Sequence, residues 1–268
     1  MSHSTISLGL GLGGGKAATS SGAPSGGGGT PFANTLSGLF DGGDNMDISS
    51  ITLSGAKAVS LWVKVGTKIA SGSGATLVAG ANDYFPYIAY GRYLYARGTN
   101  NAGTAGNVQY VDCGSGFFTS GDWFHVCISS DGTTITYYVN GSSKGTDINV
   151  DPQSLVFIGG RPSFMHDSNL DEVALWDSEL SAAQVTNIYR GEEDGGSGGT
   201  NGTPGDLSSF SPLHWWRFGD GTGDVNASGG TPANTGAIGT LVDQGSGGKN
   251  ATQTTASEQP TFSNVLPA

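Results

Sequence analysis

The stretch GDWFHVCISSDGTTITYYVNGSSKGT, residues 121–146, decides the fold of this chain. Asp131-Gly132 joins two runs rich in β-branched and aromatic residues, and Asn140-Gly141 follows the second run directly. Both dipeptides tolerate the positive φ angles that tight hairpin turns require. The stretch therefore predicts three successive antiparallel strands.

Strand-like patterns continue on both sides of this stretch. In AVSLWVKV, residues 58–65, apolar side chains recur at every second position, which is the period of a β-strand. Further short apolar runs are TLVAG at 76–80, YFPYIAYGRYLYAR at 84–97, SLVFIGG at 154–160 and NLDEVALWD at 169–177. Many short strands separated by turn residues favour an all-β sandwich over an α/β fold.

One short helix is expected after the last of these strands. Ser181 is a favourable N-cap, and Gln184 completes a capping box with it. Gly191 stands where a helix stop is expected.

Glycine divides the chain into segments. Of the 268 residues, 47 are glycine, and they crowd into two Gly-rich regions near the ends. Such regions bury too little apolar area to offset the entropy cost of ordering. The expected organisation is a Gly/Ser-rich N-terminal arm (1–35), a sandwich domain (36–191), a linker (192–211) and an extended C-terminal tail (212–268).

The charge balance narrows the classes of function. Lys and Arg number 11 against 22 Asp and Glu, so the net charge is −11. Without a basic run to neutralise phosphates, nucleic-acid binding is not expected. No apolar stretch approaches the ~18 residues of a membrane span, so no membrane insertion is expected. Cys127 lies in an apolar run typical of a buried free thiol, and its pairing with Cys113 stays open.

Four segments in order carry a family resemblance. They are LFDGGDNMDI at 39–48, AVSLWVKV at 58–65, GDWFHVCISSDGTTITYYVNG at 121–141 and LDEVALWDSELSAAQVTNIY at 170–189. Together they resemble the laminin-G-like, pentraxin-like branch of the concanavalin A-like lectin/glucanase superfamily. The resemblance covers roughly residues 36–190. It implies a two-sheet antiparallel jelly-roll sandwich, with the short helix after its last core strand and extended arms at both ends.

Glycoside hydrolases of this fold carry paired carboxylates along one strand. The nearest candidates here, Asp171 and Glu172, are adjacent, and adjacent residues of a regular strand point to opposite faces. We therefore expect no catalytic residues and a protein that is not an enzyme.

A calcium site is one candidate that the resemblance implies. The rim loop FDGGDN would supply Asp41, Asp44 and Asn45, and Asp171 would approach from the last core strand. Oxygen ligands in a Gly-rich loop suit calcium. The alternative is that the loop is a tight turn and that Asp171 binds backbone amides.

A carbohydrate site is a second candidate. Tyr84, Tyr87, Tyr90 and Tyr93 lie in one short segment, and aromatic rings stack on the apolar faces of sugars. The alternative is that these tyrosines are ordinary strand residues that pack across the sheet.

Trp215, Trp216 and Phe218 form an aromatic cluster in a tail too short to bury them. They are expected to dock onto a partner, which is either this protein's own sandwich or another subunit.

Gly-rich arms around a laminin-G-like domain are similar to virion structural proteins of tailed phages. That resemblance implies a non-catalytic capsid decoration (cement) protein or fibre component, made in the host cytoplasm and located in the virion. Its partners would be a major capsid protein or further copies of itself. The alternative is an extracellular carbohydrate-binding module or adhesin for cell-surface glycans, with calcium as a candidate cofactor.

Overall fold

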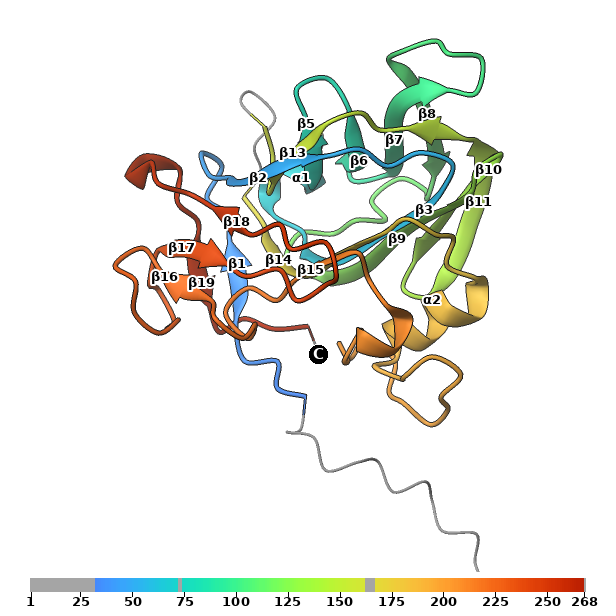
Figure 1. Ribbon diagram of the computed structural model, residues 1–268. Coiled ribbons are helices and arrows are strands. Elements are labelled where there is room, and N and C mark those ends of the chain that lie inside the picture. Colours follow the sequence, from blue (N-terminus) through green and yellow to red (C-terminus); the bar gives the residue numbers. More distant parts are fainter. Residues whose placement is uncertain (1–31, 72–73, 162–166, 268) are drawn as a thin grey trace, which may run out of the picture. The chain divides into compact units, whose positions relative to one another are not determined.

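The computed structural model describes residues 32–71, 74–161 and 167–267, and these ranges contain two antiparallel sheets stacked face to face (Figure 1). The first sheet has the order β11 (Ser142–Ile148), β10 (Thr134–Val139), β9 (Trp123–Asp131), β3 (Ala56–Lys64), β14 (Asn169–Trp176), β1 (Ser37–Leu39) and β19 (Thr261–Ser263), with β15 (His214–Trp216) also paired to β14.

The second sheet has the order β12 (Val150–Asp151), β7 (Tyr93–Asn100), β6 (Tyr84–Ala89), β5 (Val78–Gly80), β13 (Leu155–Ile158), β2 (Met46–Ile51), β18 (Ala251–Thr252), β17 (Ile238–Leu241) and β16 (Val225–Asn226). In addition, β4 (Gly74–Thr76) pairs with β6 and β8 (Asn107–Asp112) pairs with β7. The helices are α1 (Thr67–Ala70) and α2 (Ala182–Tyr189), with single 3₁₀ turns at Ser208–Phe210 and Ala256–Glu258. The predicted all-β sandwich is confirmed.

The hairpins predicted from residues 121–146 are present. Strands β9, β10 and β11 pair in sequence. Asn140 and Gly141 both have positive φ, 50° and 71°, and Gly132 has φ 92°. These angles give the backbone the twist that a tight antiparallel turn needs.

The central strands of the first sheet are covered on both faces. All eight positions of β14 are buried, as are the inner seven positions of β3. Their inner faces join the core between the sheets, while their outer faces lie under α2 and residues 207–210. The outer cluster comprises Ala58, Cys127, Tyr138, Ala174, Trp176, Leu180, Val185, Ile188, Leu207, Phe210 and Trp215.

Helix α2 forms as its sequence predicts. The Ser181 side chain accepts a hydrogen bond from the Gln184 backbone amide, and the Gln184 side chain accepts from the Ser181 backbone amide, which completes the capping box. Val185 and Ile188 pack the helix against the outer face of the first sheet (Figure 1). Cys127 lies beneath this layer, and both Cys127 and Cys113 are free thiols.

The C-terminal segment differs from the expected extended tail, because it supplies strands to both sheets. Strand β15 pairs with β14, β19 pairs with β1, and β18 lies between β2 and β17. Trp216 and Phe218 are fully buried in the core between the sheets, and Trp215 packs in the outer cluster. The aromatic cluster therefore docks onto this protein's own sandwich, so it is not available to another subunit.

The expected linker is also folded onto the sandwich. Leu207 and Phe210 are buried, and the Trp176 indole donates a hydrogen bond to the Phe210 carbonyl oxygen at 2.8 Å. Glu192 accepts from the Gly199 amide at 2.6 Å, so polar contacts order the Gly-rich turn before them. Of the expected arm, residues 1–31 lie outside the described residues. Within the described ranges, no helix is long and apolar enough to cross a membrane.

Candidate functional site

Six tyrosine rings form a continuous row on the outer face of the second sheet. Neighbouring ring centroids lie 4.8–6.3 Å apart, and the rings belong to β6, β7, β8 and the turn between β6 and β7. The row consists of Tyr84, Tyr87, Tyr95, Tyr93, Tyr110 and Tyr90. Tyr90 is 63% exposed and Tyr110 is 51% exposed, so solvent reaches the row.

Strand alternation and register explain why these rings gather. On β7, Tyr93 and Tyr95 point outward, while Leu94 between them is buried. Tyr95 stands opposite Tyr87 of β6 on one side and Tyr110 of β8 on the other. Cross-strand neighbours on one face lie within contact distance, so the two pairings place the three rings together.

The structure brings together all four tyrosines that the sequence singled out, and it adds two more. Tyr95 follows from the period-two pattern of β7 and could have been found from the sequence. Tyr110 could not, because only the pairing of β8 with β7 brings it to Tyr95. Burial raises the phenol pKa of Tyr84, Tyr87 and Tyr95, so these rings stay neutral.

A cavity of about 510 Å³ adjoins the Tyr84 end of the row. Its wall comes from the turn before β6, the outer side of β7, the loop before β8 and the segment after β12. The lining residues are Ala81, Asn82, Asp83, Arg97, Thr99, Ala105, Gly106, Gln153 and Ser154. A cavity with several convergent polar groups beside an aromatic surface is the arrangement expected of a small-ligand site.

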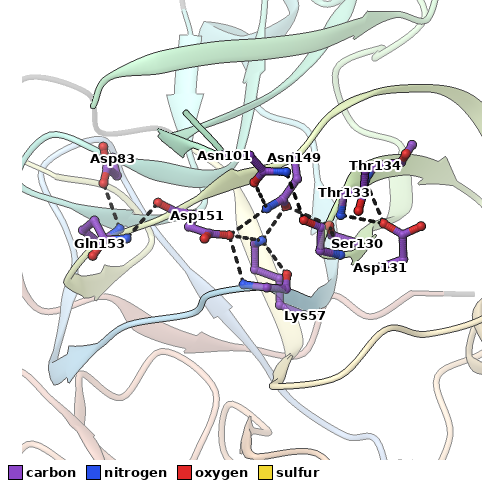
Figure 2. Close-up of polar contacts among 12 residues, drawn as sticks. Lys57, Asp83, Asn101, Ser130, Asp131, Thr133, Thr134, Asn149, Asp151 and Gln153 are labelled. Carbon is purple, nitrogen blue, oxygen red and sulfur yellow. Dashed lines mark hydrogen bonds and ion pairs between the residues drawn. The ribbon is translucent and has the colours of Figure 1, made fainter. Parts of the chain in front are cut away.

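A buried polar network is connected to this cavity through Asp151 and Gln153 (Figure 2). Lys57 is fully buried, and its ammonium donates hydrogen bonds to Asp151 and Asn149, each at 2.6 Å. Asn149 also accepts from the Ser130 hydroxyl at 2.7 Å. Since Lys57 belongs to the first sheet and Asp151 to the second, the ion pair ties the two sheets together.

The network reaches the cavity through the backbone that follows β12. Asp151 is two residues before Gln153, whose backbone amide donates to the Asp83 carboxylate at 2.8 Å (Figure 2). Hydrogen bonds therefore tie two lining residues, Asp83 and Gln153, to each other and to the network.

The four residues expected to bind calcium do not converge. Antiparallel pairing sets Gly38 opposite Leu170, which places Asp171 toward the start of β1, whereas the loop with Asp41 follows the end of β1. The Asp44 carboxylate accepts from the Asp41 amide at 2.9 Å, as the tight-turn alternative requires.

Asn45 is engaged elsewhere, because its side-chain oxygen accepts from the Gln253 amide at 2.8 Å. In the part of the chain that the structure describes, no group of three or more His, Cys, Asp or Glu side chains could hold a metal ion. The calcium set expected from the loop is therefore not assembled.

Asp171 and Glu172 break the strand alternation that the sequence implied. Glu172 has φ 48°, and the register of β14 against β3 shifts between Asp171 and Ala174. Both carboxyls are consequently buried. Glu172 accepts hydrogen bonds from the Trp215 indole at 2.5 Å and from Arg217 at 3.2 Å.

Burial dominates the acidity of this pair. It raises the pKa of Asp171 well above its ordinary value, and the neighbouring charges of Glu172 and Asp220 add to that rise. Burial also raises the pKa of Glu172 to about 7, although Arg217 and the Trp215 indole act against the rise.

Raised carboxyl pKa values make stability depend on pH. Between about pH 4.5 and 7 the folded protein binds more protons than the unfolded chain, so the free energy of unfolding should fall as pH rises. For Glu172 alone the loss approaches roughly 3 kcal/mol above pH 7. Asp44, whose pKa burial raises to about 6, acts in the same direction. Urea unfolding at pH 5 and pH 8 measures the difference.

Asp171→Asn should flatten this dependence and stabilise the protein at pH 8, because it removes one buried charge of the pair. The control is Asp177→Asn, an exposed residue just beyond the same strand, which should keep the slope of the unmodified protein. If the free energy of unfolding of the Asp171→Asn protein still fell with pH as steeply as that of the unmodified protein, the buried carboxyl pair would not be the cause of the pH dependence.

The sequence profile of the concanavalin A-like lectin/glucanases superfamily matches residues 40–186, just over half of the chain. The chain therefore belongs to this superfamily. The match ends before β15, so the C-terminal strands lie outside it. No curated protein matches this sequence.

Several solved structures align with this chain. A proposed carbohydrate binding protein from Bacteroides ovatus aligns with a TM-score of 0.57 and 15% identity, over 88% of this chain and 62% of that one. A heptameric SAP-like pentraxin from Limulus polyphemus aligns with a TM-score of 0.46 and 18% identity, over 58% of this chain and 82% of the pentraxin chain. The botulinum neurotoxin serotype D binding domain aligns with a TM-score of 0.46 and 14% identity, over 80% of this chain and 53% of that domain's chain. At such identities the likeness concerns the fold alone.

Proposed function

We propose that this protein is a non-catalytic carbohydrate-binding module whose binding face is the tyrosine row with its adjoining cavity. The observation that carries the proposal is the row itself, six rings in contact on a solvent-facing sheet. Aromatic rings stack on the apolar faces of sugars, and side chains at the edge of a site orient the hydroxyl groups.

The chemistry of the face favours a sugar over an apolar partner. Each ring carries a phenol oxygen, and the cavity adds Asp83, Arg97, Thr99 and Gln153 as hydrogen-bonding groups. A sugar offers hydroxyl groups to such a lining and C–H faces to the rings. The fold supports the proposal by analogy, because the Bacteroides ovatus relative is described as a proposed carbohydrate binding protein.

The non-catalytic part of the proposal rests on Asp171 and Glu172, the nearest candidates in the sequence for a glycosidase carboxyl pair. A retaining or inverting glycosidase needs two carboxyls that flank the glycosidic bond. Asp171 and Glu172 are instead buried, and Glu172 is held by Trp215 and Arg217. Their contacts suit packing rather than attack on a sugar.

A virion role is supported less well. The features that point to that role are the N-terminal arm, of which residues 1–31 lie outside the described residues, and the aromatic cluster of the tail. Trp216 and Phe218 are buried within the sandwich. We therefore put the extracellular glycan-binding role first.

Tyr95→Ala should weaken glycan binding about tenfold, because Tyr95 contacts three other rings at the centre of the row. A glycan array probed with the full chain, with and without calcium, identifies binders, and calorimetry then measures their dissociation constants.

Tyr95→Phe is the matched control. It keeps the ring and should bind nearly as the unmodified protein does. If the protein bound no glycan on the array, or if the Tyr95→Ala and unmodified proteins bound the same glycan with equal affinity, the proposal would be overturned.

A further inference from the structure

We infer that the cavity beside the tyrosine row selects a carboxylate-bearing sugar residue, which it binds through Arg97. This inference rests on the proposed carbohydrate-binding function and names the class of sugar.

Arg97 is placed to face the same ligand as the tyrosines. It follows Tyr93 and Tyr95 at two-residue spacing on β7, so its side chain lies on the same face. It stands opposite Tyr84 in the register with β6, and it lines the cavity. A sugar seated on Tyr84 would therefore lie next to the guanidinium.

Arg97 differs from the other arginines in its partners. Arg92 pairs with Asp112, Arg190 lies 3.6 Å from Glu192, and Arg217 lies 3.2 Å from Glu172. Within residues 32–71, 74–161 and 167–267, the Arg97 guanidinium makes no hydrogen bond or salt bridge, and its Nε is buried without a partner. A ligand carboxylate that binds the Arg97 guanidinium would therefore displace no acceptor among these residues.

The cavity lining holds one cation, Arg97, and one carboxylate, Asp83, and a second arginine, Arg161, lies near Tyr84. Burial raises the pKa of the Tyr84 phenol, and Arg97 and Arg161 both act against that rise, so both guanidinium groups lie within electrostatic reach of Tyr84. Arg161 also donates to the carbonyl oxygen of Ala81, a lining residue. The one carboxylate of the lining, Asp83, accepts a hydrogen bond from the Gln153 amide and holds the wall.

The loop before β8 lies close to the guanidinium of Arg97. Gly106 has φ 72°, and a Cβ atom there would lie 3.0 Å from Nη2 of Arg97. Glycine thus lets the loop backbone approach the guanidinium closely. A planar guanidinium offers parallel N–H groups that match the two oxygens of a carboxylate, which favours a sugar acid over a neutral sugar.

Calorimetry with the full chain tests the inference with matched probes. These are galacturonic acid oligosaccharides, the same oligosaccharides as methyl esters, sialyllactose, and a sulfated oligosaccharide. The unmodified protein should bind at least one carboxylate probe at least tenfold more tightly than the ester. Comparing the galacturonic acid oligosaccharides with sialyllactose shows whether the bound carboxylate belongs to a uronic acid or to a sialic acid. Raising the salt concentration should weaken carboxylate binding and leave ester binding unchanged.

Arg97→Gln should lower the affinity for the carboxylate probe to the level of the ester, and Arg97→Lys should retain part of it. Arg190→Gln, which removes an arginine outside the site, should change neither affinity. Equal binding of acid and ester that is unaffected by Arg97→Gln would overturn the inference and leave the proposed function standing. Binding of the sulfated probe as tightly as the carboxylate would also overturn it. Failure to bind any sugar would instead overturn the proposed function.

Discussion

A chain that ends at residue 211 should not fold to a stable structure. It lacks β15, β16, β17, β18 and β19, and β18 is the strand that joins β17 to β2 in the second sheet. It also lacks core side chains that are almost completely buried, namely Trp216, Phe218, Ile238, Leu241 and Phe262. Burying each such side chain contributes about 1.5–3 kcal/mol. Together they approach or exceed the roughly 5–15 kcal/mol of net stability that a domain has.

The loss is measured by near-UV circular dichroism and urea unfolding. The truncated chain should show no cooperative transition, because the inner faces of β14 and β1 would be left uncovered. Adding residues 212–268 as a separate fragment provides the control, and it should restore part of the native signal. A truncated chain with a cooperative transition close to that of the full chain would show that the C-terminal strands are dispensable.

Asp151→Ala should destabilise the protein by about 3–5 kcal/mol, because it leaves the fully buried Lys57 ammonium without its anion. Burial already lowers the pKa of Lys57, and Asp151 is the group that acts against this. Without Asp151, the ammonium must either stay charged with only the neutral acceptors of Asn149 and Gly55 or lose its proton. Either outcome costs free energy of folding.

A double-mutant cycle tests this prediction. Lys57→Met should cost less than Asp151→Ala, since the Asp151 side chain is 23% exposed and water can reach it. The double variant Lys57→Met/Asp151→Ala should then be more stable than Asp151→Ala alone, because no unpaired buried charge remains. Additive effects of the two substitutions in urea unfolding would show that the pair is not coupled.

Local signals in the sequence were sufficient for the hairpins and the helix. The Asp131-Gly132 and Asn140-Gly141 turns and the Ser181–Gln184 capping box depend on residues a few positions apart, so no distant contact was needed to predict them. The alternation of Tyr93 and Tyr95 likewise marks one face of β7.

The C-terminal strands escaped prediction because their stability comes from partners far away in the chain. Strand β15 has three residues and pairs with β14, while β18 has two residues and pairs with β2. Strands this short have almost no pattern of their own. The Gly-rich sequence around them resembles a flexible linker until its side chains meet a sheet that is already formed.

The sequence by itself determined the all-β class, the hairpin order, the capped helix and four of the six tyrosines in the row. Only the tertiary structure decided the rest of the candidate site. Register across β6, β7 and β8 added Tyr110 and set Arg97 opposite Tyr84, and a bulge at Glu172 buried two carboxyls that a regular strand would separate. The physical reason is that periodicity places a residue on one face of its own strand, whereas its neighbours on that face are chosen by pairing between strands distant in sequence.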